Sequence, residues 1–284
     1  MTAPSVPPAR WRPRPADDVF AMTVCGRQLR VSVRRAARSG ARTPLLVING
    51  LGASLELLQP FVDELPEELE VIRFDVPGIG GSPLPVVPYH VSTLAPLLSA
   101  MVRQLGHDRV DVMGFSWGGG VAQQFAVTHR RQCRRLVLAA TGTGSLMVPA
   151  RPSVLAKMLT PRRHRDPAYV NEIAGELYGG TMRTHPERAA EVLHAGARRG
   201  PRRGYYYQLL AGAGWSSLPA LGLIRQPTLI IAGDDDPLIP TVNARIMHRG
   251  IRHSRVHIYS GGHLALLTEA AELAPVIDRF LAER

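Results

Sequence analysis

Residues 110–120 decide the fold of this chain; they read Val110-Asp111-Val112-Met113-Gly114-Phe115-Ser116-Trp117-Gly118-Gly119-Gly120. The apolar run at 110–113 is typical of a buried strand, and apolar residues recur at helical spacing after the glycines. A serine on the sharp turn between a strand and a helix is the pattern of a nucleophile elbow. Gly114 and Gly118 leave room for the two backbone segments to cross. The stretch therefore predicts Ser116 as a catalytic nucleophile.

Further strand patterns flank this stretch on both sides and alternate with helical ones. A continuous apolar run, typical of a parallel strand covered on both faces, occurs at 45–48, and further strands are predicted at 71–74, 136–140, 228–232 and 256–259. A hairpin of half-buried strands is expected at 19–24 and 29–33. Helical spacing is found at 55–65, 94–105, 241–249 and 269–282. This alternation predicts an α/β fold whose mostly parallel sheet carries helices on both faces.

The alternation stops after the sixth strand. The intervening residues carry helical patches separated by Pro, Gly and Arg, and they are too numerous for a simple loop. We expect a helical lid at 145–220, named the lid segment below, inserted into a core formed by 17–144 and 221–284. Residues 1–16 are rich in proline and are expected to be a disordered leader.

A serine nucleophile needs a general base, and the best candidate is a histidine after the last predicted strand. His263 follows a Gly-Gly turn directly behind the strand at 256–259. Reacting groups in such sheets gather at the carboxyl ends of the strands, where Ser116 also lies. Eight of the other nine histidines fall at predicted element boundaries, in loops or in the lid segment. The sequence therefore predicts His263 as the base that takes the proton of Ser116.

The base needs an acid to orient it, and three consecutive aspartates follow the strand at 228–232. We favour Asp236, because Pro237 stiffens the turn behind it and because it lies deepest in the loop. Asp234 and Asp235 remain alternatives that fit better as residues that hold the loop. In this architecture the order along the chain is serine, acid, histidine, which Ser116, Asp236 and His263 follow.

The oxyanion hole is expected from two backbone N–H groups. One belongs to Trp117, the residue after the nucleophile, and the other to Leu51 in the glycine-rich loop that follows the strand at 45–48. The simpler interpretation of that loop is a glycine turn. Asp75, at the end of its strand, is conspicuous but is expected to hold the following Pro-Gly loop.

Composition argues against several classes of partner. The chain of 284 residues has a net charge of +11, which would suit nucleic acid or a membrane, but Lys157 is the single lysine and the excess of arginine points to codon bias. No nucleic-acid-binding module is visible. Cys25 and Cys133 are too far apart for a metal or redox motif. No segment has the ~18 apolar residues of a membrane span and no signal peptide is visible, so we expect a cytoplasmic protein.

Several stretches without catalytic roles narrow the family further. They are LELLQPFV at 55–62, EVIRFDVPGIGGSPLP at 70–85, CRRLVLAATGTG at 133–144, MVPARPSVL at 147–155 and GWSSLP at 214–219. With the elbow, they make residues 17–282 resemble the α/β-hydrolase superfamily and, within it, the intracellular poly(3-hydroxyalkanoate) depolymerases that act on medium-chain polyesters. By position, the family's nucleophile, acid and base fall on Ser116, Asp236 and His263. Asn49 stands where many superfamily members have histidine.

The resemblance implies hydrolysis of the ester bonds between 3-hydroxyacyl units through an acyl-enzyme on Ser116, with water and no cofactor or metal. It also implies association with storage granules. Apolar and aromatic residues of the lid segment could contact acyl chains, although more than half of them are expected to pack the segment onto the core: Leu155, Met158, Leu159, Tyr205, Tyr206, Tyr207 and Trp215. Its arginines could face anionic granule lipids or simply keep the segment soluble: Arg162, Arg163, Arg165, Arg198, Arg199, Arg202 and Arg203.

Two other functions stay open. The first is a small-molecule carboxylesterase or carbon–carbon bond hydrolase with the same triad, which the shape of the lid segment would decide. The second is a binding or granule-coat protein with little turnover, which the complete set of Ser116, Asp236 and His263 disfavours. The sequence leaves the acyl chain length and the oligomeric state open.

Overall fold

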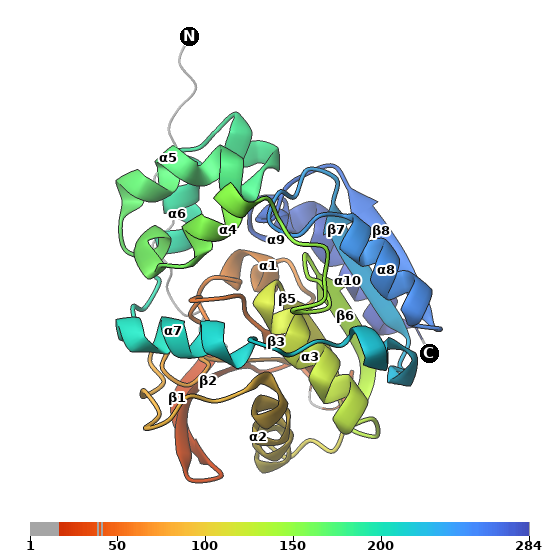
Figure 1. Cartoon of the computed structure of the whole chain (residues 1–284). Helices are drawn as coiled ribbons and strands as arrows, with labels where there is room; N and C mark the ends of the chain where they lie inside the picture. Colours follow the sequence, from red (N-terminus) through yellow and green to blue (C-terminus); the bar gives the residue numbers. More distant parts are fainter. Residues whose placement is uncertain (1–16, 39, 41, 284) are drawn as a thin grey trace.

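The computed structural model describes residues 17–38, 40 and 42–283 (Figure 1); the leader predicted at 1–16 lies outside them. Within these residues eight strands form one sheet in the order β1-β2-β4-β3-β5-β6-β7-β8. The strands are β1 (Asp17–Val24), β2 (Arg27–Arg34), β3 (Leu45–Ile48), β4 (Val71–Phe74), β5 (Val110–Phe115), β6 (Cys133–Ala139), β7 (Thr228–Gly233) and β8 (Ser254–Tyr259). β1 and β2 pair antiparallel, as do β2 and β4, and the other neighbours are parallel. The predicted fold class is confirmed.

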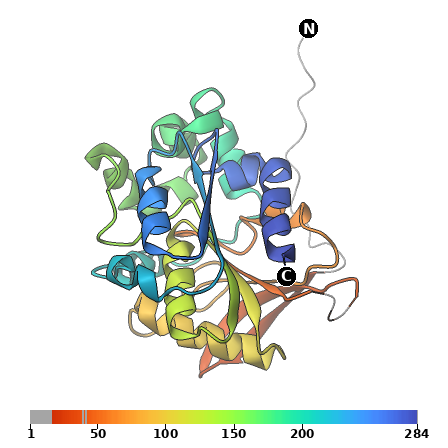
Figure 2. The same cartoon turned by 90° about the vertical axis from the view of Figure 1, so that its right-hand side faces the viewer.

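Helices cover both faces of the sheet, as Figure 2 shows. Those outside the lid segment are α1 (Gln59–Asp63), α2 (Val91–Gln104), α3 (Trp117–Thr128), α8 (Val242–Gly250), α9 (Ala265–Thr268) and α10 (Ala270–Ala282), with the 3₁₀ helix η3 (Leu218–Leu223) at the junction. Side chains alternate along each strand, so Leu45 and Val47 pack with α1 and α10, while Leu46 and Ile48 pack with α2, α3 and α8. Two apolar layers therefore enclose the sheet.

The helix predicted over 55–65 is shorter than expected. α1 begins only at Gln59, with Pro60 in its first turn, and residues 55–58 form turns. The Leu55 N–H donates to Oδ1 of Asp75 at 2.7 Å, and the Leu55 carbonyl accepts from Arg73 at 3.1 Å. These bonds to buried side chains of β4 and of the loop after it replace helical hydrogen bonds. The helical spacing of the apolar residues therefore predicts a longer helix than the one that forms.

The segment between β6 and β7 is largely helical. It contains α4 (Pro152–Met158), η1 (Pro161–His164), α5 (Pro167–Tyr178), η2 (Gly180–Arg183), α6 (Arg188–His194) and α7 (Arg202–Ala211). In Figure 1, α4, α5 and α6 lie together at the top, with α7 below them. Val154, Val170 and Leu177 belong to the same apolar cluster as Phe61 and Ile277 of the core. The helices thus share a core with the sheet, whereas the bounds 145–220 of a separate lid stay a prediction.

The two cysteine thiols differ sharply in environment, which gives a test of the fold. Cys25, in the β1–β2 turn, is exposed, whereas Cys133 at the start of β6 is buried and free. Burial raises the pKa of the Cys133 thiol well above its usual range. We expect a thiol-specific chromogenic reagent to label one cysteine in the native protein and the second only after unfolding. A Cys25→Ser variant should show no labelling until it is denatured, and rapid labelling of that native variant would contradict this placement of β6.

Candidate active site

Ser116 lies on a strained turn between β5 and α3. Its backbone angles are φ 52° and ψ −122°, a region that a residue other than glycine adopts only under constraint. A Cβ atom on Gly114 would collide with the backbone of Gly118 and Gly119, and one on Gly118 would collide with the carbonyl of Ile48. The glycines predicted to allow a backbone crossing therefore lie where β5, α3 and the end of β3 meet.

The three residues predicted to act with one another are brought together in a chain of hydrogen bonds. Nε2 of His263 lies 3.0 Å from Oγ of Ser116, and Nδ1 of His263 lies 2.8 Å from Oδ2 of Asp236. The other Asp236 oxygen accepts from the N–H groups of Leu238 and Ile239 at 2.9 and 2.8 Å. His263 and Asp236 are buried. This geometry lets imidazole accept the hydroxyl proton while the carboxylate fixes its orientation.

The two alternative acids contact other groups. Asp234 accepts a hydrogen bond from the Gly261 N–H at 3.0 Å, which ties the β7 loop to the β8 loop. Asp235 forms an ion pair with Arg183 and accepts from the Gly180 N–H, both in the lid segment. Both aspartates therefore hold loops, the role that the sequence favoured for them.

The lid segment contributes directly to the placement of His263. The carbonyl of Tyr178, the last residue of α5, accepts from the His263 N–H at 2.7 Å. The rings of Phe115 and Tyr178 lie 5.4 and 6.3 Å from the imidazole centroid. Cβ atoms on Gly180 or Gly262 would collide with backbone, so this approach requires glycine at both positions. No local pattern signals this contact, because Tyr178 and His263 are far apart along the chain.

The loop predicted to supply an oxyanion donor lies against the nucleophile. A Cβ atom on Gly50 would stand 3.4 Å from Cβ of Ser116. Asn49 donates from its side chain to the Ser54 carbonyl at 2.9 Å and so closes the loop. Among the described residues, no acceptor is found for the backbone N–H of Leu51 or of Trp117. Leu51 and Trp117 both line a cavity together with Ser116, and the joint role of their N–H groups as an oxyanion hole stays a prediction.

An apolar cavity of about 250 Å³ opens at Ser116. Its walls come largely from the lid segment and the elements beside it, with large side chains from Met147, Leu155, Met158, Leu209, Trp215 and Ile239. Such a cavity is suited to an alkyl or other apolar group next to the reacting atom. Trp215, which the sequence placed on an acyl-binding surface, lines it.

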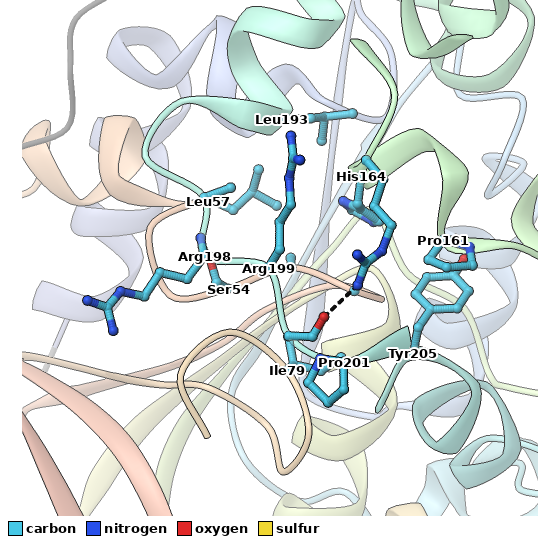
Figure 3. A pocket seen from close by; sticks show the side chains of 15 residues that line it. Ser54, Leu57, Ile79, Pro161, His164, Leu193, Arg198, Arg199, Pro201 and Tyr205 are labelled. Carbon is cyan, nitrogen blue, oxygen red and sulfur yellow. Dashed lines mark hydrogen bonds between the residues drawn. The ribbon is translucent and has the colours of Figure 1, made fainter. Parts of the chain in front are cut away.

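A second, smaller cavity of about 30 Å³ lies between Ser116, His263 and the lid residues Arg163 and His164. It shares Ala53, Leu57, His164 and Leu193 with a cationic pocket of about 40 Å³ (Figure 3). That pocket is also lined by Arg165, Arg198 and Arg199. Arg165 donates to the Gly200 carbonyl at 2.5 Å.

The arginines of the lid segment divide into two groups. Arg163 is only 3% exposed and donates to the Tyr205 hydroxyl and to the Leu51 carbonyl, so the expectation that it faces a lipid surface is wrong. Tyr205 is likewise buried and donates to the Met158 carbonyl. Side chains exposed at the surface of the segment include Arg162, Arg198, Arg199, Arg202, Arg203, Leu155, Leu159, Tyr206 and Leu210.

The described residues carry no candidate metal centre and no candidate membrane span. Within them, no group of three or more His, Cys, Asp or Glu side chains is arranged to hold a metal ion. Among the helices formed by this part of the chain, none has both the length and the apolar character required to cross a bilayer.

Comparison with known proteins places the chain in a family. The model of the alpha/beta hydrolase fold family matches residues 43–270. The poly(3-hydroxyalkanoate) depolymerase of Ectopseudomonas oleovorans is 49% identical over 255 residues, which cover 89% of each chain. The 2-hydroxymuconate semialdehyde hydrolase of Pseudomonas sp. strain CF600 is 27% identical and covers 86% of this chain and 89% of its own.

A solved structure shows the same architecture. The enol-lactonase from Burkholderia xenovorans LB400 superimposes with a TM-score of 0.79 at 21% identity, covering 93% of this chain and 100% of its own. At this identity the likeness concerns the fold alone. The family model and the relative at 49% identity carry the assignment: the chain belongs to the α/β-hydrolase family and is an ester hydrolase.

Proposed function

We propose that this protein hydrolyses the ester bonds of a poly(3-hydroxyalkanoate) with medium-length side chains, using Ser116, His263 and Asp236 as a catalytic triad. The observation that carries the proposal is the apolar cavity that opens at Ser116, beside a His263 whose Nε2 lies 3.0 Å from the serine hydroxyl. The depolymerase that is 49% identical over 89% of the chain supports the choice of polymer. The alkyl side chain of a 3-hydroxyacyl unit would occupy the cavity.

In the proposed reaction, Oγ of Ser116 attacks the ester carbonyl while Nε2 of His263 takes its proton. The carbonyl oxygen becomes negatively charged and is stabilised by the N–H groups of Leu51 and Trp117. When the tetrahedral intermediate collapses, the alkoxide leaves with the proton from His263 and the acyl group stays on Ser116. Water, deprotonated by His263, then attacks the acyl-enzyme, releasing the carboxylic acid and restoring the serine. Asp236 stabilises the imidazolium in both steps.

We also propose that the lid segment covers the cavity and contacts the surface of the polymer granule. Leu159 is 63% exposed and Tyr206 is 42% exposed, which is unusual for such large side chains on a packed helical segment. Arg162 and Arg202 line the same surface pocket as Tyr206. A surface with exposed apolar groups among cations suits a polymer coated with anionic amphiphiles.

A second candidate is the cleavage of small soluble esters or of carbon–carbon bonds. The 27% identity to a 2-hydroxymuconate semialdehyde hydrolase over 86% of the chain favours it. The same serine and histidine would serve in that reaction, so only the substrate distinguishes the two candidates.

The substrate is tested with granules. We expect the purified protein to release 3-hydroxy acids from medium-chain polyester granules, and a Ser116→Ala variant to release none above background. Chromatography of the acids measures this, with a p-nitrophenyl ester as a parallel substrate. Turnover of the soluble ester without release of acids from granules would reject the polymer and favour the second candidate. Equal activity of the Ser116→Ala variant would reject the proposed nucleophile.

The triad is tested as a unit. Replacing Ser116 or His263 with alanine should lower kcat by about 10⁴-fold or more, and replacing both should cost little beyond either change alone. The reason is that the serine is a weak nucleophile without its base, so either change removes the same step. Rate constants for the p-nitrophenyl ester, with circular dichroism as a check of folding, test this. If the fold-loss of kcat in the double variant equalled the product of the two single losses, Ser116 and His263 would not act in the same step.

Contact with the granule surface gives a further prediction. Leu159→Asp should lower adsorption to polyester granules, because a charge replaces an exposed apolar contact, and should leave turnover of a soluble ester within about twofold. Sedimentation of granules with bound protein measures adsorption. Val86→Asp is the matched control, since Val86 is 96% exposed in the loop between β4 and α2. If both variants adsorb like the unaltered protein, Leu159 has no part in granule contact.

A further inference from the structure

Gln208, in α7 of the lid segment, is fully buried and binds the loop that follows β3. Its Oε1 accepts from the Gly52 N–H at 2.8 Å, and its Nε2 donates to the Gly50 carbonyl at 3.3 Å. The Gly50 carbonyl belongs to the same peptide group as the Leu51 N–H. One side chain from the lid segment therefore holds the peptide whose N–H has no acceptor among the described residues.

Two further residues of the lid segment hold the next peptide of the loop. The Leu51 carbonyl accepts from Nη2 of Arg163 at 3.0 Å and lies 3.0 Å from Nε2 of His164. His164, which also lies on the wall of the pocket in Figure 3, has a pKa held well below its usual value, chiefly by burial and then by the charge of Arg163. It therefore stays neutral, and a carbonyl partner requires that its Nε2 carry the proton.

The lid segment bonds some backbone groups of this loop and leaves one of them without a partner in the described part of the chain. The lid segment satisfies the carbonyl of Gly50, the carbonyl of Leu51 and the N–H of Gly52, and among the described residues it leaves the Leu51 N–H between them without an acceptor. Gly50 also accepts from the Ala53 N–H at 3.3 Å within the loop. The orientation of the peptide plane that carries the Leu51 N–H thus depends on a side chain 158 residues further along the chain.

We propose that Gln208 is a positioning residue of the oxyanion hole, which fixes and polarises the peptide that presents the Leu51 N–H to the developing negative charge. The inference rests on the proposed serine mechanism. A hydrogen bond to a peptide carbonyl strengthens the N–H of the same peptide as a donor, and a fixed dipole needs no reorganisation when charge develops. Gln208 would therefore act on the transition state more than on the bound substrate.

The test compares two identical substitutions at buried glutamines. Gln208→Met keeps the length of the side chain and removes both hydrogen bonds. Gln226→Met is the control, because Gln226 is also buried, donates to the Ala126 carbonyl at 2.9 Å and accepts from the Arg225 N–H at 3.1 Å, away from the site. We expect Gln208→Met to lower kcat for a p-nitrophenyl ester about 10- to 100-fold with KM within about twofold, and Gln226→Met to leave both constants within about twofold.

A transition-state mimic separates positioning from a general loss of structure. The serine oxygen adds to the carbonyl carbon of an alkyl trifluoromethyl ketone and forms a tetrahedral adduct with a negatively charged oxygen. The corresponding secondary alcohol has no carbonyl group, cannot form this adduct and stays neutral. Affinity for the ketone should fall in Gln208→Met by about the same factor as kcat, while affinity for the alcohol stays unchanged. A change in KM or in alcohol affinity with kcat retained would overturn the proposal, as would equal ketone affinity in both variants.

Two other causes of lost activity, misfolding of the variant and failure of the serine mechanism, can be told apart from loss of the positioning role. If Gln208→Met does not fold, Gln208→Asn is used, because it retains an amide on a side chain one methylene shorter. In this variant kcat and ketone affinity should fall less than in Gln208→Met, and both should fall by about the same factor. Unchanged kcat in this variant would again overturn the inference. Failure of the serine mechanism would appear differently, as equal activity of Ser116→Ala and the unaltered protein, whereas failure of the inference leaves that Ser116 dependence intact.

Discussion

The site depends on the close backbone crossing at the end of β5. Gly114 and Gly118 have no side chain, so the turn at Ser116 can pack directly against the end of β3 and its loop. A Cβ atom at Gly118 would collide with the carbonyl groups of Ile48 and Asn49 and so force α3 away from the end of β3. The positive φ of Ser116 is stable only because β5 and α3 are both packed on their sheet neighbours. Packing of the core thus stabilises the strain at the nucleophile.

The lid segment contributes contacts to the candidate site. Its Tyr178 carbonyl holds the backbone of His263, its Arg183 and Gly180 bind Asp235, and its Gln208 binds the loop after β3. The loops after β3, β7 and β8, which carry proposed reacting groups, are therefore all bonded to the lid segment. The same segment thus contacts the backbone of His263 and lines the cavity at Ser116.

The excess of positive charge has more than one structural use. Arg30 pairs with Glu56 and Asp75 inside the protein, and Arg73 pairs with Asp17, so these arginines hold β1, β2 and β4 to one another and to the turns before α1. Asp75 also accepts from the Gly81 N–H, which confirms that it holds the Pro-Gly loop. Arg163 is buried against the loop after β3, whereas most other arginines of the lid segment are at the surface. The composition does not distinguish buried, paired arginines from exposed ones, because which side chains are buried depends on the fold.

The sequence by itself determined the strands, the elbow and the order of the loops, because strand and helix periodicity and glycine turns are encoded by neighbouring residues. It also predicted that Ser116, Asp236 and His263 come together, since parallel strands bring their carboxyl ends to one edge. Only the tertiary structure decided that α1 begins at Gln59, that Arg163 is buried, and that Gln208 binds a loop 156 residues earlier. These features arise from contacts between distant segments, whose geometry no local pattern specifies.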